Sequence, residues 1–126
     1  MREILFRGET KKGEWVYGSP IFQDGYVLIR FWNSEEFEYE EYLIIPETIG
    51  QYTGLTDKNG TKIFEGDIIL WGLAPCVAKY DTENARFMFY ENVKYLKNGF
   101  NKDTMEMKEV IGNIHDNPEL LGGDTK

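Results

Sequence analysis

The sequence is poor in the residue types on which most catalytic and metal sites depend. Its 126 residues include one cysteine, Cys76, and one histidine, His115. A single cysteine cannot form a disulfide within the chain or a cysteine-cluster zinc site, and it fits a reducing compartment. A single histidine, with no serine or cysteine motif for it to activate, gives no pair of nucleophile and base. We therefore expect a protein that is not an enzyme and needs no cofactor.

Long apolar segments and positive charge are also scarce. No apolar run approaches the roughly 20 residues of a membrane span, and residues 1–12 hold too short an apolar run for a signal peptide. The 14 lysines and arginines stand against 22 aspartates and glutamates, which gives a net charge of −8. Because phosphates have to be met by cations, this balance disfavours a nonspecific hold on nucleic acid or on an anionic membrane. The expected compartment is the cytoplasm.

Aromatic residues, by contrast, are abundant, with 3 Trp, 8 Tyr and 8 Phe. Aromatic and β-branched residues favour strands, and the pair Asp24 and Gly25 between two such runs is typical of a tight hairpin. Along residues 36–46 acidic and aromatic residues alternate as in a half-buried strand, which Pro46 ends. The first half is therefore predicted to be a β-meander, with strands at residues 3–7, 14–22, 26–32 and 36–46.

The second half has shorter predicted elements. Residues 46–54 are predicted as one or two helical turns that connect the halves, with Pro46 at the first helical position and Gly54 at the C-terminal cap. Asn59 and Gly60 predict a two-residue type I′ hairpin. The other predicted elements are strands at residues 62–64, 67–71, 76–80, 85–91 and 107–115, and a helical turn at 116–121.

Four stretches of the sequence carry a family resemblance. They are ILFRG at residues 4–8, GEWVYG at 13–18, IPETIGQYTGLTDKNGTKIFEGDII at 45–69 and VIGNIHDNPELL at 110–121. Together they resemble YopX-type proteins, a family encoded in phages and prophages of bacteria. The resemblance implies a phage or prophage origin, the cytoplasm of a bacterial host, and a small fold that is mostly β or α+β. It implies no catalytic residues, because the family has no established function and no recognised catalytic set.

These observations predict a mostly β (α+β) fold in a single YopX-like domain over residues 1–126. Its halves would be the meander at 1–50 and, after the short helical turn, a small barrel-like, SH3-like half at 51–121. The step from Gly66 and Asp67 into a strand also occurs in small SH3-like barrels, which is the sequence feature behind that part of the prediction.

Glutamates gather in one segment of the first half. Glu36, Glu38 and Glu40 would project from one face of the predicted strand, with Glu35 and Glu41 beside them. Such a row can bind a basic partner or mimic the phosphates of a nucleic acid. A charged row can equally be the solvated face of a strand, or a protection of a sheet edge against pairing with another edge. The first three glutamates are one set of candidate interaction residues.

Basic and aromatic residues alternate in a second candidate region, residues 86–102. Its candidate residues are Arg86, Lys94, Lys97 and Lys102. Single-stranded nucleic acid is bound by this combination, since bases stack on rings and cations follow the phosphates. The alternative is that the aromatic residues belong to the core and the lysines to the solvated surface, which the net charge favours. Residues 91–104 fit a helix, a loop or a strand.

Asp57, Glu65 and Asp67 are the candidates for a metal-assisted site. Glu65 and Asp67 flank Gly66, and in an extended chain they would project to the same side, where Asp57 could join them. The alternative is a turn that enters a strand, with Asp67 accepting hydrogen bonds from local backbone amides. No further ligand or oriented base stands at a supporting spacing, so the turn is the preferred interpretation.

The function that the sequence favours is a non-catalytic binding module for a protein partner from the host or the phage. Its aromatic content leads us to expect an exposed patch and hence a homo-oligomer. The alternative is a nucleic-acid-binding module that uses residues 86–102.

Overall fold

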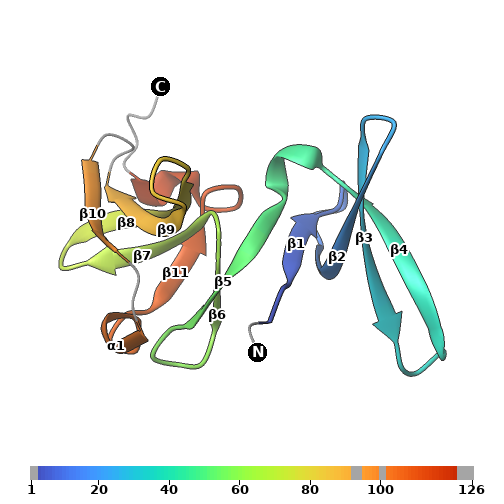
Figure 1. The fold of residues 1–126 in the computed structure, drawn as a ribbon, viewed down its shortest axis with the longest axis horizontal. Coiled ribbons are helices and arrows are strands. Elements are labelled where there is room, and N and C mark those ends of the chain that lie inside the picture. Colours follow the sequence, from blue (N-terminus) through green and yellow to red (C-terminus); the bar gives the residue numbers. More distant parts are fainter. Residues whose placement is uncertain (1–2, 92–94, 100–101, 122–126) are drawn as a thin grey trace. The chain divides into compact units, whose positions relative to one another are not determined.

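The computed structural model describes residues 3–91, 95–99 and 102–121 of the chain. The described chain is mostly β, in two antiparallel sheets. It divides into two compact units, Met1–Tyr52 and Thr53–Lys126 (Figure 1). The single domain with halves at 1–50 and 51–121 stays a prediction. None of the described helical segments is long and apolar enough to cross a membrane.

The first unit is a meander of antiparallel strands, as predicted. Strands β2 and β3 are joined at Asp24 and Gly25, whose positive φ angles of 51° and 83° are those of a tight hairpin. Its elements are β1 (Phe6–Glu9), β2 (Trp15–Gln23), β3 (Tyr26–Asn33), β4 (Glu38–Ile44), the 3₁₀ turn η1 (Pro46–Thr48) and β5 (Gly50–Thr56), which continues into the second unit. The sheet has the order β4-β3-β2-β1-β5-β6, where β6 is Lys62–Phe64. Among the described strands β4 is therefore an edge (Figure 1).

Three buried side chains form the core of the first unit: Val27, Ile29 and Ile44. Val27 and Ile29 alternate with more exposed residues along β3, because successive side chains of a strand point to opposite faces. Ile44 joins them since it is paired with Val27 in the register of β3 and β4. The partly buried side chains that pack around this core are Phe6, Val16 and Ile49. The other side of β3 and β4 faces away from it.

The predicted helical connector at residues 46–54 is wrong in its length. One 3₁₀ turn at Pro46–Thr48 is followed by extended chain, and Gly54, with a φ of 94°, lies within β5 instead of ending a helix. The side chain of Thr48 fixes the turn, because its hydroxyl accepts a hydrogen bond from the amide of Glu9 at 2.9 Å. Pairing of β5 with β1 then satisfies backbone groups that further helical turns would have used.

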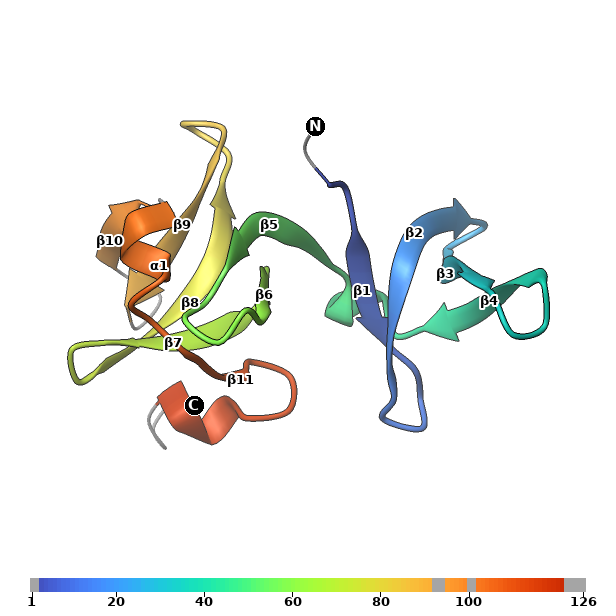
Figure 2. The same ribbon diagram turned by 90° about the horizontal axis from the view of Figure 1, so that it is seen from below.

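The second unit holds the other antiparallel sheet, built from strands near those predicted. Its elements are β7 (Asp67–Trp71), β8 (Ala74–Asp81), β9 (Arg86–Glu91), β10 (Tyr95–Gly99), the helical turn α1 (Lys102–Met105), β11 (Val110–Asn113) and the 3₁₀ turn η2 (Pro118–Leu121). The strand order is β10-β9-β8-β7-β11, so β11 returns to lie beside β7 (Figure 2). Within residues 91–104, where the sequence left three alternatives, the described parts include β10 and α1.

A set of fully buried side chains fills the core of the second unit. They are Ile63, Ile69, Cys76, Ala78, Phe89 and Met105. Phe89 is the largest of them, and the half-buried Trp71 packs on its ring with centroids 6.1 Å apart. The core thus draws on strands, on α1 and on the β6 segment, which accounts for the compactness of this unit.

The SH3-like, barrel-like form predicted for the second half is not confirmed. The described strands form an open sheet with β10 and β11 at its edges, and no closed barrel is present among them. Both edge strands are short, and each pairs with its neighbour through a shifted register. A sheet closes into a barrel only if the register shifts by a consistent amount from strand to strand, and the irregular pairings of β10 and β11 interrupt that shift.

Candidate interaction surface

One side of β3 and β4 faces away from the core of the first unit and carries apolar, aromatic and charged side chains. We call it the outer face, and its residues are Tyr26, Leu28, Arg30, Trp32, Phe37, Tyr39, Glu41 and Leu43. The register sets three cross-strand pairs on it: Leu28 with Leu43, Arg30 with Glu41, and Trp32 with Tyr39. Tyr26 is 61% exposed and Phe37 82% exposed. Apolar side chains gathered in the open in this way mark an interaction site more often than a plain solvated surface.

An aromatic cluster around Trp32 forms one end of the outer face. The ring of Trp32 meets Phe37 edge to face with centroids 5.6 Å apart, and it meets Tyr39 with centroids 5.0 Å apart. The guanidinium carbon of Arg30 lies 4.2 Å from the ring centroid of Tyr39, and its Nε is 3.9 Å from Oε2 of Glu41. The edge contacts hold the rings in place, and the guanidinium of Arg30 already covers one face of Tyr39. The three rings remain exposed, so this end of the outer face can contact an apolar group of a partner.

A shallow hollow forms the other end of the outer face. Its volume is about 370 Å³, and its lining residues are Gln23, Asp24, Tyr26, Leu28 and Leu43. The lining is mostly apolar, with the side chains of Gln23 and Asp24 as its polar members. Such a hollow has room for an apolar side chain of a partner and places a carboxylate beside it.

The predicted row of glutamates is only partly formed. Glu38 and Glu40 lie in β4 and project to the side opposite the outer face, whereas Glu36 lies before the strand, where its amide donates to Oδ1 of Asn33 at 3.1 Å. Glu40 accepts hydrogen bonds from Nδ2 of Asn33 at 2.6 Å and from the hydroxyl of Tyr42 at 3.0 Å. The bond to Glu40 and the negative charge of that carboxylate raise the pKa of Tyr42 above its ordinary value.

The strand predicted at residues 36–46 begins later than expected, because Phe37 precedes it. Phe37 has a φ of 57° and precedes β4, so it belongs to the turn after β3. Asn33 forms the turn, because its Oδ1 accepts hydrogen bonds from the amides of Glu35 and Glu36. The turn places the ring of Phe37 against the ring of Trp32.

The basic candidates lie in the second unit. Arg86 is exposed at the start of β9, and its Nε is 3.8 Å from Oδ2 of Asp81. Lys102 is exposed at the start of α1. Lys94 lies outside the described residues, and so does the side chain of Lys97 in β10.

The aromatic residues of the same region divide between core and surface. Phe89 is fully buried, in agreement with the interpretation of these residues as core. Phe87 is half-buried and packs edge to face on Tyr80, with centroids 5.1 Å apart. In the described part of this region Phe89 therefore belongs to the core. No group of exposed rings there is comparable to the aromatic cluster of the outer face.

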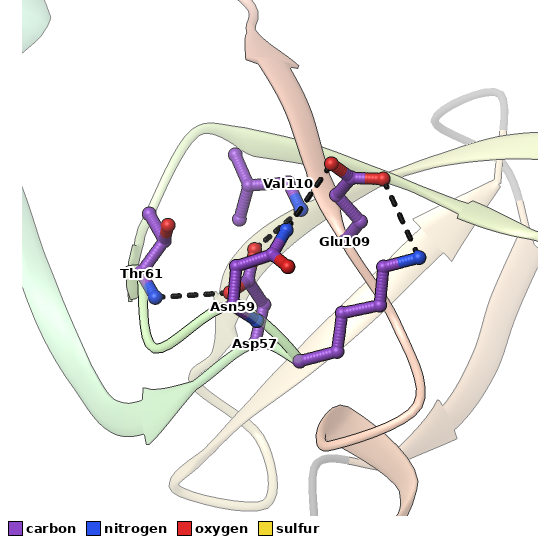
Figure 3. A network of polar contacts seen from close by, with 6 residues as sticks. Asp57, Asn59, Thr61, Glu109 and Val110 are labelled. Atoms are coloured by element: carbon purple, nitrogen blue, oxygen red, sulfur yellow. Dashed lines mark hydrogen bonds and ion pairs between the residues drawn. The ribbon is translucent and has the colours of Figure 1, made fainter.

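Asp57 is a buried carboxylate that joins a hairpin to β11 (Figure 3). Its Oδ1 accepts the amides of Asn59 at 2.8 Å and Thr61 at 2.9 Å, and its Oδ2 accepts the amide of Val110 at 2.9 Å. Burial alone would raise the pKa of Asp57, but the three amides and the positive charge of Lys58 outweigh it and lower that pKa below its ordinary value. The carboxylate is occupied by backbone, which is a structural role.

The same hydrogen bonds explain why the predicted type I′ turn is wrong. Gly60 has a φ of 81°, but Asn59 is not among the residues with positive φ. The side chain of Asp57 accepts hydrogen bonds from the amides of Asn59 and Thr61, two and four residues further on. The amide of Gly60 donates to the carbonyl of Asp57 at 3.0 Å. A side chain that bonds to its own following backbone forms its own type of turn, which the dipeptide Asn-Gly alone does not reveal.

The three metal candidates have separate positions. Asp67 accepts the amide of Phe64 at 2.7 Å, across Gly66, whose φ is 91°. This is the strand-entry turn that the sequence favoured. Within the residues that the structure describes, no group of three or more His, Cys, Asp and Glu residues is placed to hold a metal ion. Asp57, Glu65 and Asp67 therefore do not form the site that their spacing allowed.

The sequence leads us to expect an exposed aromatic patch but does not locate it. Residues 26–32 are treated there only as an aromatic and β-branched run, although both sides of the alternation along β3 are apolar. Tyr26, Leu28 and Trp32 lie on one side, and Val27 and Ile29 on the other. A strand of this composition is typical of sheets that are covered on both faces, and that pattern is the signal that could have found the surface.

The comparisons with known proteins extend over nearly the whole chain. The chain matches no curated protein. It is similar to a solved structure, the crystal structure of protein EF1440 from Enterococcus faecalis, with a TM-score of 0.62 and 26% sequence identity. That match covers 96% of this chain and 99% of the other. Residues 5–122 match the YopX protein family, which agrees with the resemblance found in the sequence. The chain therefore belongs to the YopX family.

Proposed function

We propose that this chain is a non-catalytic interaction module, encoded by a phage or prophage and acting in the bacterial cytoplasm, that binds a protein partner on its outer face. The observation that carries the proposal is the combination of exposed aromatic rings at one end of that face with an apolar hollow at the other. Interfaces are enriched in aromatic residues and arginine, and the outer face supplies both on paired strands.

Charge indicates what kind of protein the partner is. The segment 26–44, from β3 through β4, contains five glutamates and one arginine, for a net charge of −4. A partner that approaches this segment gains attraction if it is basic, and a second copy of the same segment is repelled. We therefore propose a basic partner. A homo-oligomer, the other expectation from the sequence, would have to form on a different surface.

We also propose that the second unit is an open variant of an SH3-like sheet. The order of its strands supports this proposal, since β7 to β10 follow one another as neighbours and β11 returns to β7 after the helical turn α1. In this arrangement the second unit is a stable body, and the first unit presents the binding surface.

Recovery of partners from lysogenic or infected cells tests the proposed function. The test variant is Trp32→Ala with Tyr39→Ala, and the matched control is Tyr80→Ala, which removes a similarly exposed ring from the second unit. We expect wild type and control to retain the same protein, the double variant to lose it, and nuclease to leave recovery unchanged. Three results contradict the proposal: no retained protein, retention by the double variant, or loss on nuclease treatment. The last would favour nucleic acid at residues 86–102.

A further inference from the structure

The outer edge of β4 is a free pairing edge within the described part of the chain. Strand β4 pairs with β3 over its whole length, in one unbroken register from Ile44 opposite Val27 to Glu38 opposite Asn33. It ends the sheet, and it contains neither a proline nor a bulge, two of the devices by which proteins block an edge strand. A third device, charged side chains, is present as Glu38, Glu40 and Glu41. The unused main-chain groups of β4 can still accept another strand.

We infer that the basic partner binds as an extended segment that adds a strand to this edge of β4. The inference rests on the proposed function and specifies how the partner is held. Pairing with β4 would place alternate side chains of the added strand beside the outer face, and the intervening ones beside Glu38 and Glu40. Backbone bonds would supply general affinity, and the side chains of the outer face would select the sequence.

The order of side chains along β4 sets the pattern of the partner. On the outer face the strand presents Leu43, then Glu41, then Tyr39. An added strand therefore needs an apolar residue beside Leu43 and the hollow, a lysine or arginine beside Glu41, and an apolar residue beside Tyr39. These positions are two residues apart, so the pattern is apolar, any, basic, any, apolar, over roughly 13 Å of extended chain.

The glutamates distinguish this occupant from a second copy of the chain. In a pairing of two β4 edges, Glu38, Glu40 and Glu41 of one strand would lie near the same glutamates of the other, and like charges across a pair of strands are destabilising. The same residues favour an added strand that carries cations. The acidic row thus prevents pairing between copies and leaves the edge open to a basic segment.

A synthetic peptide tests the inference directly, with binding to the full-length chain measured by calorimetry. Its sequence alternates threonine with leucine, arginine and leucine, in the predicted pattern. Two further peptides carry N-methyl groups on one or the other alternate set of amides, because successive amides of a strand point to opposite edges. Strand addition predicts that one methylated peptide binds as the parent does and that the other binds at least about tenfold more weakly.

Charge exchange at Glu41 supplies the second arm of the experiment. The variant Glu41→Lys should bind the arginine peptide about two- to fivefold more weakly and should bind a glutamate version more tightly than wild type does. The control Glu83→Lys, an exposed charge in the second unit, should change neither affinity.

Two results overturn the inference: the parent peptide does not bind, or both methylated peptides bind equally well. The proposed function survives either result if partner recovery still depends on Trp32 and Tyr39. If partner recovery is also independent of those two residues, the proposed function fails as well.

Discussion

The two units use the same kinds of residue in opposite ways. In the second unit the large ring of Phe89 is fully buried, and Trp71 packs on it from the side of the core. In the first unit Trp32 is 47% exposed, and its aromatic neighbours Phe37 and Tyr39 are more exposed still. This difference supports the proposed roles, in which the second unit is the stable body and the first unit presents the binding surface.

The same difference holds for two pairs of acidic side chains, one pair buried in the second unit and the other exposed in the first. Asp57 and Asp67 accept backbone amides and fix the turns of the second unit. In the first unit Glu38 and Glu41 lie exposed on an edge strand, where Oε2 of Glu41 is 3.9 Å from Nε of Arg30. Exposed ion pairs add little to stability, so these glutamates are available for recognition of a partner.

The largest expected effect comes from removing the central ring of the second unit. Phe89→Ala should lower the free energy of unfolding by about 3–5 kcal/mol, because the substitution leaves a cavity in a closely packed core. Chemical denaturation followed by circular dichroism measures it. Tyr80→Ala, on the surface of the same sheet, should cost less than about 1.5 kcal/mol. Equal losses in the two variants would show that the second unit is not the stable body.

A smaller effect is expected at Asp57. Asp57→Asn removes the charge and turns one acceptor into a donor that faces backbone amides, so it should cost about 1–3 kcal/mol at pH 7.

The pH dependence of the Asp57→Asn variant has a definite sign. Because folding lowers the pKa of Asp57, its contribution is present above the ordinary value of 3.8 and is lost as the pH falls through the lower, folded value. The stability difference between wild type and variant should therefore shrink below about pH 4. Urea titrations from pH 7 to pH 3 test this, and a constant difference would contradict the assigned role.

The smallest effect on stability is expected on the outer face. Trp32→Ala should change the free energy of unfolding by about 1 kcal/mol or less, since the ring is exposed and only its edge contacts are lost. Trp71→Ala, which removes the half-buried tryptophan of the second unit, should cost about 2 kcal/mol or more. Denaturation of the two variants side by side makes the comparison. A larger loss at Trp32 would mean that its ring serves the fold of the first unit.

Much of the fold follows from local sequence chemistry. The hairpin at Asp24 and Gly25, the strand DIILW at residues 67–71 and the turn before it are governed by nearby residues, and all three are observed as predicted. The type I′ turn at Asn59 is wrong because the side chain of Asp57 bonds to the backbone that follows it, and β11 holds that side chain through the amide of Val110. The helical connector to Gly54 is wrong because β1, distant in sequence, pairs with β5.

The candidate surface was harder to predict than the fold. The sequence shows that residues 36–41 are acidic, but the side of the sheet that each glutamate occupies depends on where the strand begins. The turn at Asn33 places Phe37 outside β4, so the aromatic cluster arises from turn geometry and from register. Neither can be obtained from alternation alone.

We propose that a partner binds at β4 of the first unit and leaves the second unit unchanged. Hydrogen exchange of backbone amides, followed by NMR on the full-length chain with and without the arginine peptide, tests it most directly. Binding at β4 predicts slower exchange for amides of β4 and shifted signals for Trp32 and Tyr39 on the outer face, with β7, β8 and β9 unaffected. Protection in the second unit, or no change in β4 when the peptide binds, would contradict it.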